Sequence, residues 1–115
     1  GGFIELKAPY PIFVAAEMPE ETIIKKYALT STDYFGASDT TVQRMPSTWS
    51  LDGFDSLNGK WVVIDNRVEE PPWDHSETRK YVVQRPGLFS SYRIRIAATY
   101  NSEGVTRIKE FKFSR

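Results

Sequence analysis

Hydrophobic and polar residues alternate along much of this chain. In the clearest example, residues 92–98, every second side chain is apolar, and Arg93 and Arg95 fall between them. Successive side chains of a β-strand point to opposite faces, so this segment is predicted to have one buried and one hydrated face. No segment keeps a helical period over the length of a helix. The pattern therefore predicts an all-β protein.

Other segments with strand-like composition follow the same rule. The predicted strands are Phe3–Lys7, Ile12–Glu17, Thr22–Thr30, Thr48–Asp52, Lys60–Asp65, Arg79–Gln84 and Thr106–Phe113. Turn-forming pairs such as Asn58-Gly59 and Pro86-Gly87 separate them, and both residues of Asn58-Gly59 are expected to supply positive φ angles. Many short strands with frequent turns favour a β-sandwich or barrel, and residues 1–115 are expected to form one domain.

Two connections are longer than a hairpin requires, Ser31–Ser47 and Asn66–Thr78. Long loops on a rigid β scaffold are common sites of binding, so the functional residues are expected there. Residues 101–104, from Asn101 to Gly104, could form a third wall of such a site.

Composition narrows the classes of partner. Hydrophobic residues make up 40% of the chain and charged residues 26%, as in an ordinary globular domain. Fifteen basic and fifteen acidic residues leave no net charge to attract nucleic acid or an anionic membrane surface. Cysteine is absent, which excludes disulfides, thiolate metal sites and a cysteine nucleophile.

The motifs that resemble catalytic sites do not meet their chemical requirements. The segment from Gly53 to Trp61 has five residues between its glycines and a tryptophan where a phosphate loop needs a hydroxyl. Asp74, His75 and Ser76 are consecutive, and consecutive side chains cannot relay a proton in series. His75 is the only histidine. We therefore expect no enzymatic activity.

Aromatic residues in the long loops are the best candidates for ligand contact. Sugar rings pack against exposed aromatic faces, and nearby polar side chains bind the hydroxyl groups. The candidate sugar-binding residues are Trp73, His75, Asp74, Tyr34, Phe35, Arg44 and Asn101. Two alternatives remain open: Trp73 could fold back over the edge of the sandwich, and His75 could be a hydrated loop residue without a ligand.

Two adjacent segments resemble a known family signature. The sequence PSTWSLDG at 46–53, followed by NGKWVVIDNR at 58–67, is similar to the discoidin or coagulation factor type C (F5/8 type C) domain. Later segments around Tyr81, Tyr92 and Phe111 match in order, so the resemblance extends from about Pro9 to Phe113. It implies a galactose-binding-domain-like jelly-roll sandwich. Family members include lectin-like carbohydrate-binding, membrane-binding and adhesion modules.

The resemblance also implies structural roles for six residues, together with a first strand and a calcium loop that this sequence does not show. Positions that are structural in the family are Trp49, Trp61, Arg67, Tyr92, Arg93 and Glu110, which are therefore expected to pack or to form core hydrogen bonds. Family members usually have a first strand and often a calcium loop before the point where this sequence starts. Calcium is thus implied by the resemblance only, without an assigned residue, and the first strand is expected to be absent here.

These observations predict a non-catalytic carbohydrate-binding or adhesion module of a larger secreted, cell-surface, virion or phage tail protein. An accessory domain of a secreted glycosidase would fit this description. The alternative is a structural or protein-interaction module of a larger assembly, because a fold does not determine its ligand. In the first case the partner is a carbohydrate or glycoconjugate, together with the other domains of the polypeptide.

Overall fold

The computed structural model describes residues 4–7, 9–32, 44–100 and 105–115, without the side chains of 4–7, 105 and 107. It contains no α-helix in these ranges, as the alternation predicted. The strands are β1 (Ile4–Lys7), β2 (Ile12–Ile23), β3 (Lys26–Thr30), β4 (Pro46–Asp55), β5 (Lys60–Arg67), β6 (Thr78–Val82), β7 (Leu88–Thr99), β8 (Val105–Ile108) and β9 (Glu110–Ser114).

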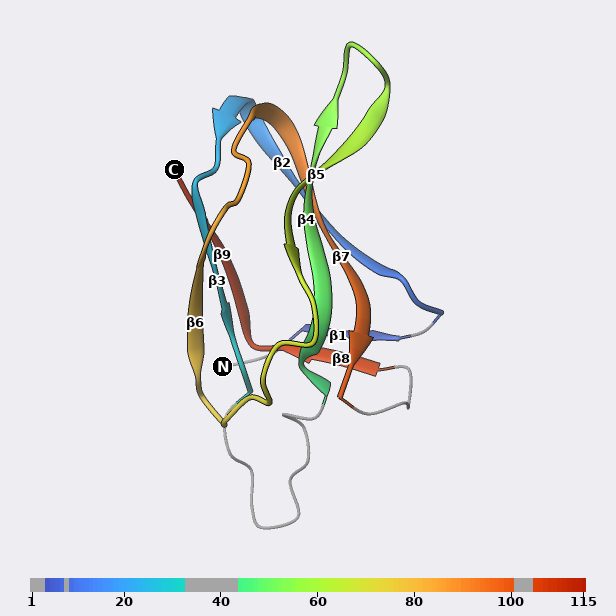
Figure 1. The fold of residues 1–115 in the computed structure, drawn as a ribbon, viewed down its shortest axis with the longest axis vertical. Helices are drawn as coiled ribbons and strands as arrows, with labels where there is room; N and C mark the ends of the chain where they lie inside the picture. The colour runs from blue at the N-terminus through green and yellow to red at the C-terminus, as the bar shows by residue number, and fades with distance from the viewer. Residues whose placement is uncertain (1–3, 8, 33–43, 101–104) are drawn as a thin grey trace.

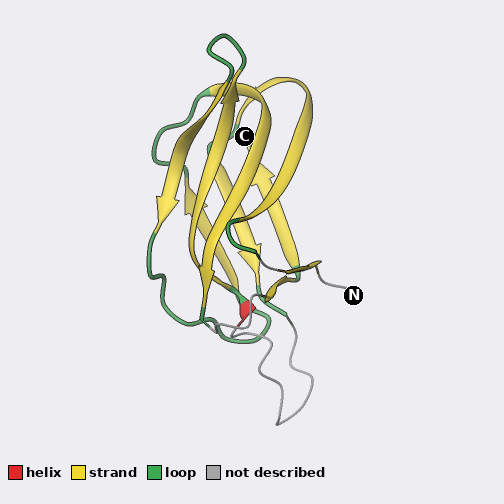
Figure 2. Cartoon of the chain, turned by 90° about the vertical axis from the view of Figure 1, so that its right-hand side faces the viewer, coloured by secondary structure: helices red, strands yellow, loops and turns green. Residues whose placement is uncertain are grey.

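Two antiparallel sheets face each other as a sandwich (Figures 1 and 2). The larger sheet has the strand order β2-β7-β4-β5 and the smaller has the order β6-β3-β9. A short third sheet, β1-β8, lies at one end of the sandwich (Figure 1). The predicted all-β sandwich is confirmed.

The core lies between the two large sheets and follows the sequence alternation. In β7 the side chains of Tyr92, Ile94 and Ile96 are buried, and Leu51 on β4 pairs with Ile94. The opposing sheet contributes Tyr27, which stacks on Tyr81 with ring centroids 5.2 Å apart. Phe89, Phe111 and Phe113 are partly buried and pack against this core.

A buried carboxylate connects the two sheets. Asp65 on β5 accepts a hydrogen bond from the Tyr27 hydroxyl on β3, and Trp49 Nε1 donates to the same tyrosine oxygen at 2.9 Å. Arg67 donates to both Asp65 oxygens, at 3.0 and 3.1 Å, and the Gln84 backbone amide donates at 3.1 Å. Burial and the hydrogen bond to Asp65 raise the pKa of Tyr27 well above its ordinary value. Trp49 and Arg67 therefore have the structural roles that the resemblance implied.

Three local expectations need correction. Trp61 is only half-buried. It lies three residues before the buried Ile64 on β5, so its side chain points to the opposite face of the sheet, where it packs between Phe54 and the Arg93 guanidinium. Glu110 forms an exposed ion pair with Lys112 and is not a core residue. Only Gly59 of the Asn58-Gly59 pair has positive φ, 67°, since the Asp55 carboxylate accepts the Leu57 and Asn58 amides and shapes the turn.

The connections divide between the two ends of the sandwich. The β2–β3, β4–β5 and β6–β7 connections lie at one end, and the β5–β6 connection lies at the other, where β3 and β7 end and β4 begins (Figure 1). We call the second the loop end. It contains the second of the two long connections that the sequence singled out, Asn66–Thr78.

Candidate functional site

Hydrogen bonds fix the β5–β6 connection, residues 68–77, against the end of β3. The Ser31 amide donates to the Glu77 carbonyl at 2.8 Å, and the Glu77 amide donates to Ser31 Oγ at 2.8 Å. Ser31 Oγ in turn donates to the Asp74 carbonyl, and the Ser76 amide donates to the Thr32 carbonyl at 2.9 Å. The backbone at Glu69 and Ser76 has positive φ angles of 50° and 54°, a conformation that residues other than glycine seldom adopt. The connection is thus an ordered loop.

Arg79, the second residue of β6, holds the remainder of this loop. Its guanidinium donates to the carbonyls of Pro71 and Pro72 at 2.8 and 2.6 Å, and to both Glu77 carboxylate oxygens at 2.7 and 3.1 Å. Burial alone would lower the pKa of Arg79, but the hydrogen bonds and charge of Glu77 outweigh it and raise that pKa. The same contacts with Arg79 lower the pKa of the Glu77 carboxyl.

Trp73 belongs to this loop, and its side chain is buried and only 4% exposed. Its Nε1 donates to the Pro46 carbonyl at 3.1 Å, and the Arg79 guanidinium carbon lies 4.0 Å from its ring centroid. An aromatic sugar platform needs an exposed ring face, which Trp73 does not offer here. The placement matches the alternative interpretation, in which the ring covers the sandwich, and Trp73 is therefore a support for the loop.

The two polar candidates that follow Trp73 are among the residues on the surface of the loop. Asp74 is exposed and His75 is half-buried. The Asp74 amide donates to Glu77 Oε1 at 2.9 Å, which leaves the Asp74 carboxylate outside this contact. Arg44 is half-buried at the end of the β3–β4 connection, two residues before Pro46, the acceptor of the Trp73 indole. The structure therefore brings Trp73, Asp74, His75 and Arg44 to the same end of the sandwich.

The other candidates, Tyr34, Phe35 and Asn101, lie outside the described residues. Sequence reasoning missed two residues of this end, Arg79 and Tyr100. Tyr100 is 36% exposed directly after β7, and burial raises its pKa, with Arg79 opposing the rise and Glu70 adding to it. β7 ends at the loop end, so Tyr100 lies at the same end of the sandwich as the loop (Figure 1). The sequence signal that could have identified Tyr100 is its position immediately after a strand in which apolar and polar residues alternate.

No cluster of metal-binding side chains is present in the described parts of the chain. Among these residues, no three His, Asp or Glu side chains gather in a way that could hold a metal ion. The calcium that the family resemblance implies therefore has no cluster of acidic side chains to hold it among these residues. The described residues form no helix that is long and apolar enough to cross a membrane.

Comparison of the sequence with protein-family models and with curated proteins gives no match. Solved structures do match. CpGH89CBM32-5 from Clostridium perfringens, in complex with GalNAc-β-1,3-galactose, has a TM-score of 0.70 at 12% identity, covering 98% of this chain and 75% of that one.

Two further structures give the same result. The family 32 carbohydrate-binding module of C. perfringens NanJ, in complex with galactose, has a TM-score of 0.67 at 10% identity, covering 96% of this chain and 74% of that one. An F5/8 type C domain from Bacteroides fragilis has a TM-score of 0.62 at 9% identity, covering 88% and 62%. This chain therefore has the discoidin-type β-sandwich fold, like family 32 carbohydrate-binding modules and F5/8 type C domains.

Proposed function

We propose that this chain is a non-catalytic carbohydrate-binding module that holds a sugar at the loop end. The observation that carries the proposal is the ordered β5–β6 loop, whose backbone is fixed by Ser31 and Arg79 and whose surface presents Asp74 and His75. A loop already held in one conformation loses little entropy on binding, which favours affinity for small ligands.

The residues at this end match the chemistry of a sugar. The Asp74 carboxylate accepts hydrogen bonds from hydroxyl groups, and the Arg44 guanidinium donates to ring or hydroxyl oxygens. The partly exposed ring of Tyr100 offers an apolar face to the C–H groups of a pyranose. His75 can donate or accept. The structural neighbours that hold galactose and GalNAc-β-1,3-galactose support this ligand class for the fold.

The non-catalytic part of the proposal rests on the chemistry of the same residues. Sugar hydrolysis commonly requires two carboxylates flanking one bond, and the Glu77 carboxylate is instead occupied by Arg79 and the Asp74 amide. We infer an accessory role within a larger secreted, cell-surface or virion-associated protein. In that role the module would bring its parent protein to a glycan surface.

A glycan array, followed by calorimetry with galactose and GalNAc-β-1,3-galactose, tests this function. We expect binding by the wild-type chain and a loss of about tenfold or more for Asp74→Ala and for His75→Ala, since each removes hydrogen bonds to the ligand. Repeating the measurement with a calcium chelator tests the calcium dependence that the family resemblance implies.

The matched control is Glu20→Ala, which removes one exposed carboxylate from β2 near the opposite end of the sandwich. It should bind as the wild type does. The proposal fails if no glycan on the array binds, or if Glu20→Ala weakens binding as much as Asp74→Ala does.

One observation favours the alternative of a protein-interaction module. On the outer face of the larger sheet, Phe13 is 47% exposed, and the Arg93 guanidinium lies between its ring and that of Trp61, at 4.5 and 4.3 Å. Exposed aromatic and arginine side chains are enriched at protein interfaces. Phe13→Ser should abolish self-association, measured by analytical ultracentrifugation, if this face is an interface between copies, and should leave sugar binding unchanged.

A further inference from the structure

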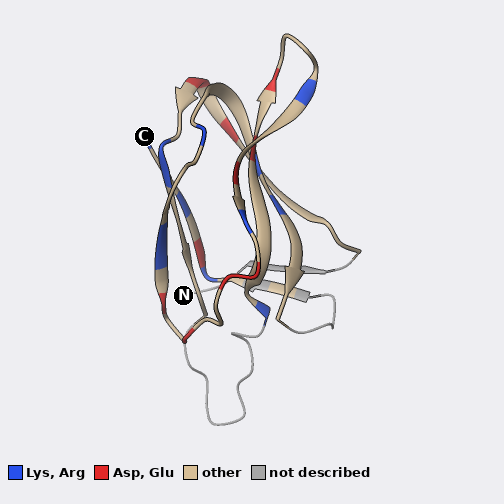
Figure 3. Cartoon of the chain, viewed as in Figure 1, with Lys and Arg blue, Asp and Glu red and all other residues tan. Residues whose placement is uncertain are grey.

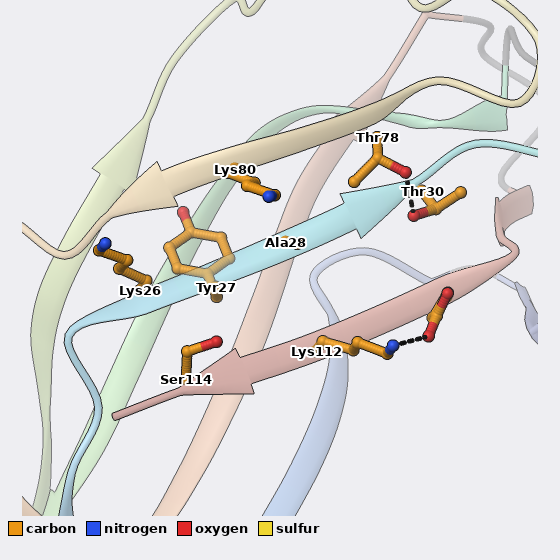
Figure 4. A pocket seen from close by; sticks show the side chains of 9 residues that line it. Lys26, Tyr27, Ala28, Thr30, Thr78, Lys80, Lys112 and Ser114 are labelled. Carbon is orange, nitrogen blue, oxygen red and sulfur yellow. Dashed lines mark hydrogen bonds and ion pairs between the residues drawn. The ribbon is translucent and has the colours of Figure 1, made fainter.

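A shallow depression of about 460 Å³ lies on the outer face of the smaller sheet, and its end at Thr30 and Thr78 adjoins the loop end. Its floor is Ala28, at the middle of the central strand β3. Lys80 on β6 and Lys112 on β9 are the register partners of Ala28 on either side, so they flank the small residue (Figure 4). The depression exists because a methyl group stands between two long side chains.

A third lysine shares this face. Side chains two residues apart on a strand point to the same side, so Lys26 lies next to Ala28 on the outer surface. Strand spacing places the backbone positions of Lys80 and Lys112 about 9–10 Å apart, across the width of two strand separations. We call Lys26, Lys80 and Lys112 the lysine triad. Figure 3, in the view of Figure 1, shows basic residues in blue on β3, β6 and β9, and Figure 4 labels the three lysines.

Carboxylates balance the positive charge of the lysine triad only in part, although the whole chain has equal numbers of acidic and basic residues. The one carboxylate lining the depression, Glu110, pairs with Lys112 at 3.0 Å. Both side chains of that pair are exposed, 71% and 45%, and ion pairs of this kind contribute little to stability. Lys26 and Lys80 form no ion pair with any carboxylate in the described part of the chain. Local positive charge is therefore available to an anionic ligand.

Hydroxyl groups complete the lining. Thr30 and Thr78 form a hydrogen bond of 2.8 Å with each other at one end of the depression, and Ser114 lies at the other. Each hydroxyl has a further donor or acceptor position for a ligand. The only aromatic residue in the lining, Tyr27, is buried in the core and offers no stacking face. Stacking therefore cannot bind a neutral sugar here, whereas ammonium and hydroxyl groups can bind an acidic one.

We propose that this face is a second binding site, for an acidic polysaccharide whose carboxylate or sulfate groups contact the lysine triad. A depression of about 460 Å³ is within the range of small-ligand sites and can hold a short run of sugar rings. An acidic peptide fits less well, because the face of a sheet presents side chains only and would leave the peptide backbone unpaired. The site goes beyond the proposed sugar site and does not depend on it.

Calorimetry with oligogalacturonate and with a heparin oligosaccharide tests the site and distinguishes carboxylate from sulfate recognition. We expect one or both to bind, with affinity that falls as salt is added, and fully methyl-esterified oligogalacturonate not to bind. Lys80→Ala and Lys112→Ala should each weaken binding about tenfold, since each removes a charge-assisted contact. Lys60→Ala, which removes an exposed lysine from the β4–β5 hairpin, is the matched control and should have no effect.

Three results would overturn the site: no binding of either acidic oligosaccharide, an equal loss for Lys60→Ala, or equally tight binding of poly-glutamate, which would indicate an acidic peptide instead. Binding of galactose at the loop end is measured in the same variants. It should be unchanged in Lys80→Ala, so that failure of one site is distinguished from failure of the other.

Discussion

Trp73 is buried by contacts that come from outside its own loop. The indole donates to the Pro46 carbonyl, and the Arg79 guanidinium covers the ring face. We expect Trp73→Ala to destabilise the chain by about 3–5 kcal/mol, because it leaves a cavity under the loop and removes a hydrogen bond. Thermal unfolding should show a melting temperature lower by several degrees.

Trp73→Phe separates the two contributions. It keeps an aromatic ring under Arg79 and removes the indole N–H, so it should cost about 1 kcal/mol. If Trp73→Ala instead kept the wild-type melting temperature and lost only sugar binding, the ring would be a ligand platform and the structural assignment would fail.

At the scale of the element, the β5–β6 loop depends on the pair Arg79–Glu77. Hydrogen bonds from Arg79 lower the pKa of Glu77 below its ordinary value of 4.5. A carboxyl whose pKa is lower in the folded state stabilises the fold above its unfolded pKa, and this contribution is lost as pH falls through the folded pKa. We expect Glu77→Gln to cost about 1 kcal/mol at pH 7.

The difference in the free energy of unfolding between Glu77→Gln and the wild type should stay constant from pH 7 to about pH 5. It should shrink below about pH 4.5. Urea unfolding across this range measures it. Glu69→Gln, in the same loop, is the control, because its exposed side chain takes part in no interaction of the described residues. If the difference in the free energy of unfolding between Glu77→Gln and the wild type did not change with pH, protonation of Glu77 would not be coupled to stability.

At the scale of the whole molecule, the buried Asp65 network joins the two sheets. Tyr27 belongs to the smaller sheet, whereas Asp65, Arg67 and Trp49 belong to the larger one. We expect Tyr27→Phe to destabilise the sandwich by about 1–3 kcal/mol, because Asp65 loses a donor and Trp49 Nε1 loses its acceptor in a buried site.

Fluorescence and circular dichroism should both report this loss as one shifted cooperative transition, since neither sheet has a complete core alone. Phe113→Leu, which changes a ring of the same sheet outside the network, is the comparison. Two separate transitions in Tyr27→Phe would mean that the sheets unfold independently and that the network does not couple them.

The sequence by itself determined the fold class and the inward residues of the regular strands. Tyr92, Ile94 and Ile96 are buried as their alternation requires, because successive residues of a strand must face opposite sides. The positive φ of Gly59 follows from local turn chemistry as well. These features depend on neighbours in the chain, so a local pattern is enough to predict them.

Only the tertiary structure decided the surroundings of Trp73 and the grouping of the lysine triad. Trp73 lies in an irregular loop, where no period assigns an inside, and its partner Pro46 is distant in sequence. Lys26, Lys80 and Lys112 come together because the register of β3 with β6 and β9 aligns them. Strand pairing across long sequence separations is set by the packing of the whole sandwich, and so it leaves no local signal in the chain.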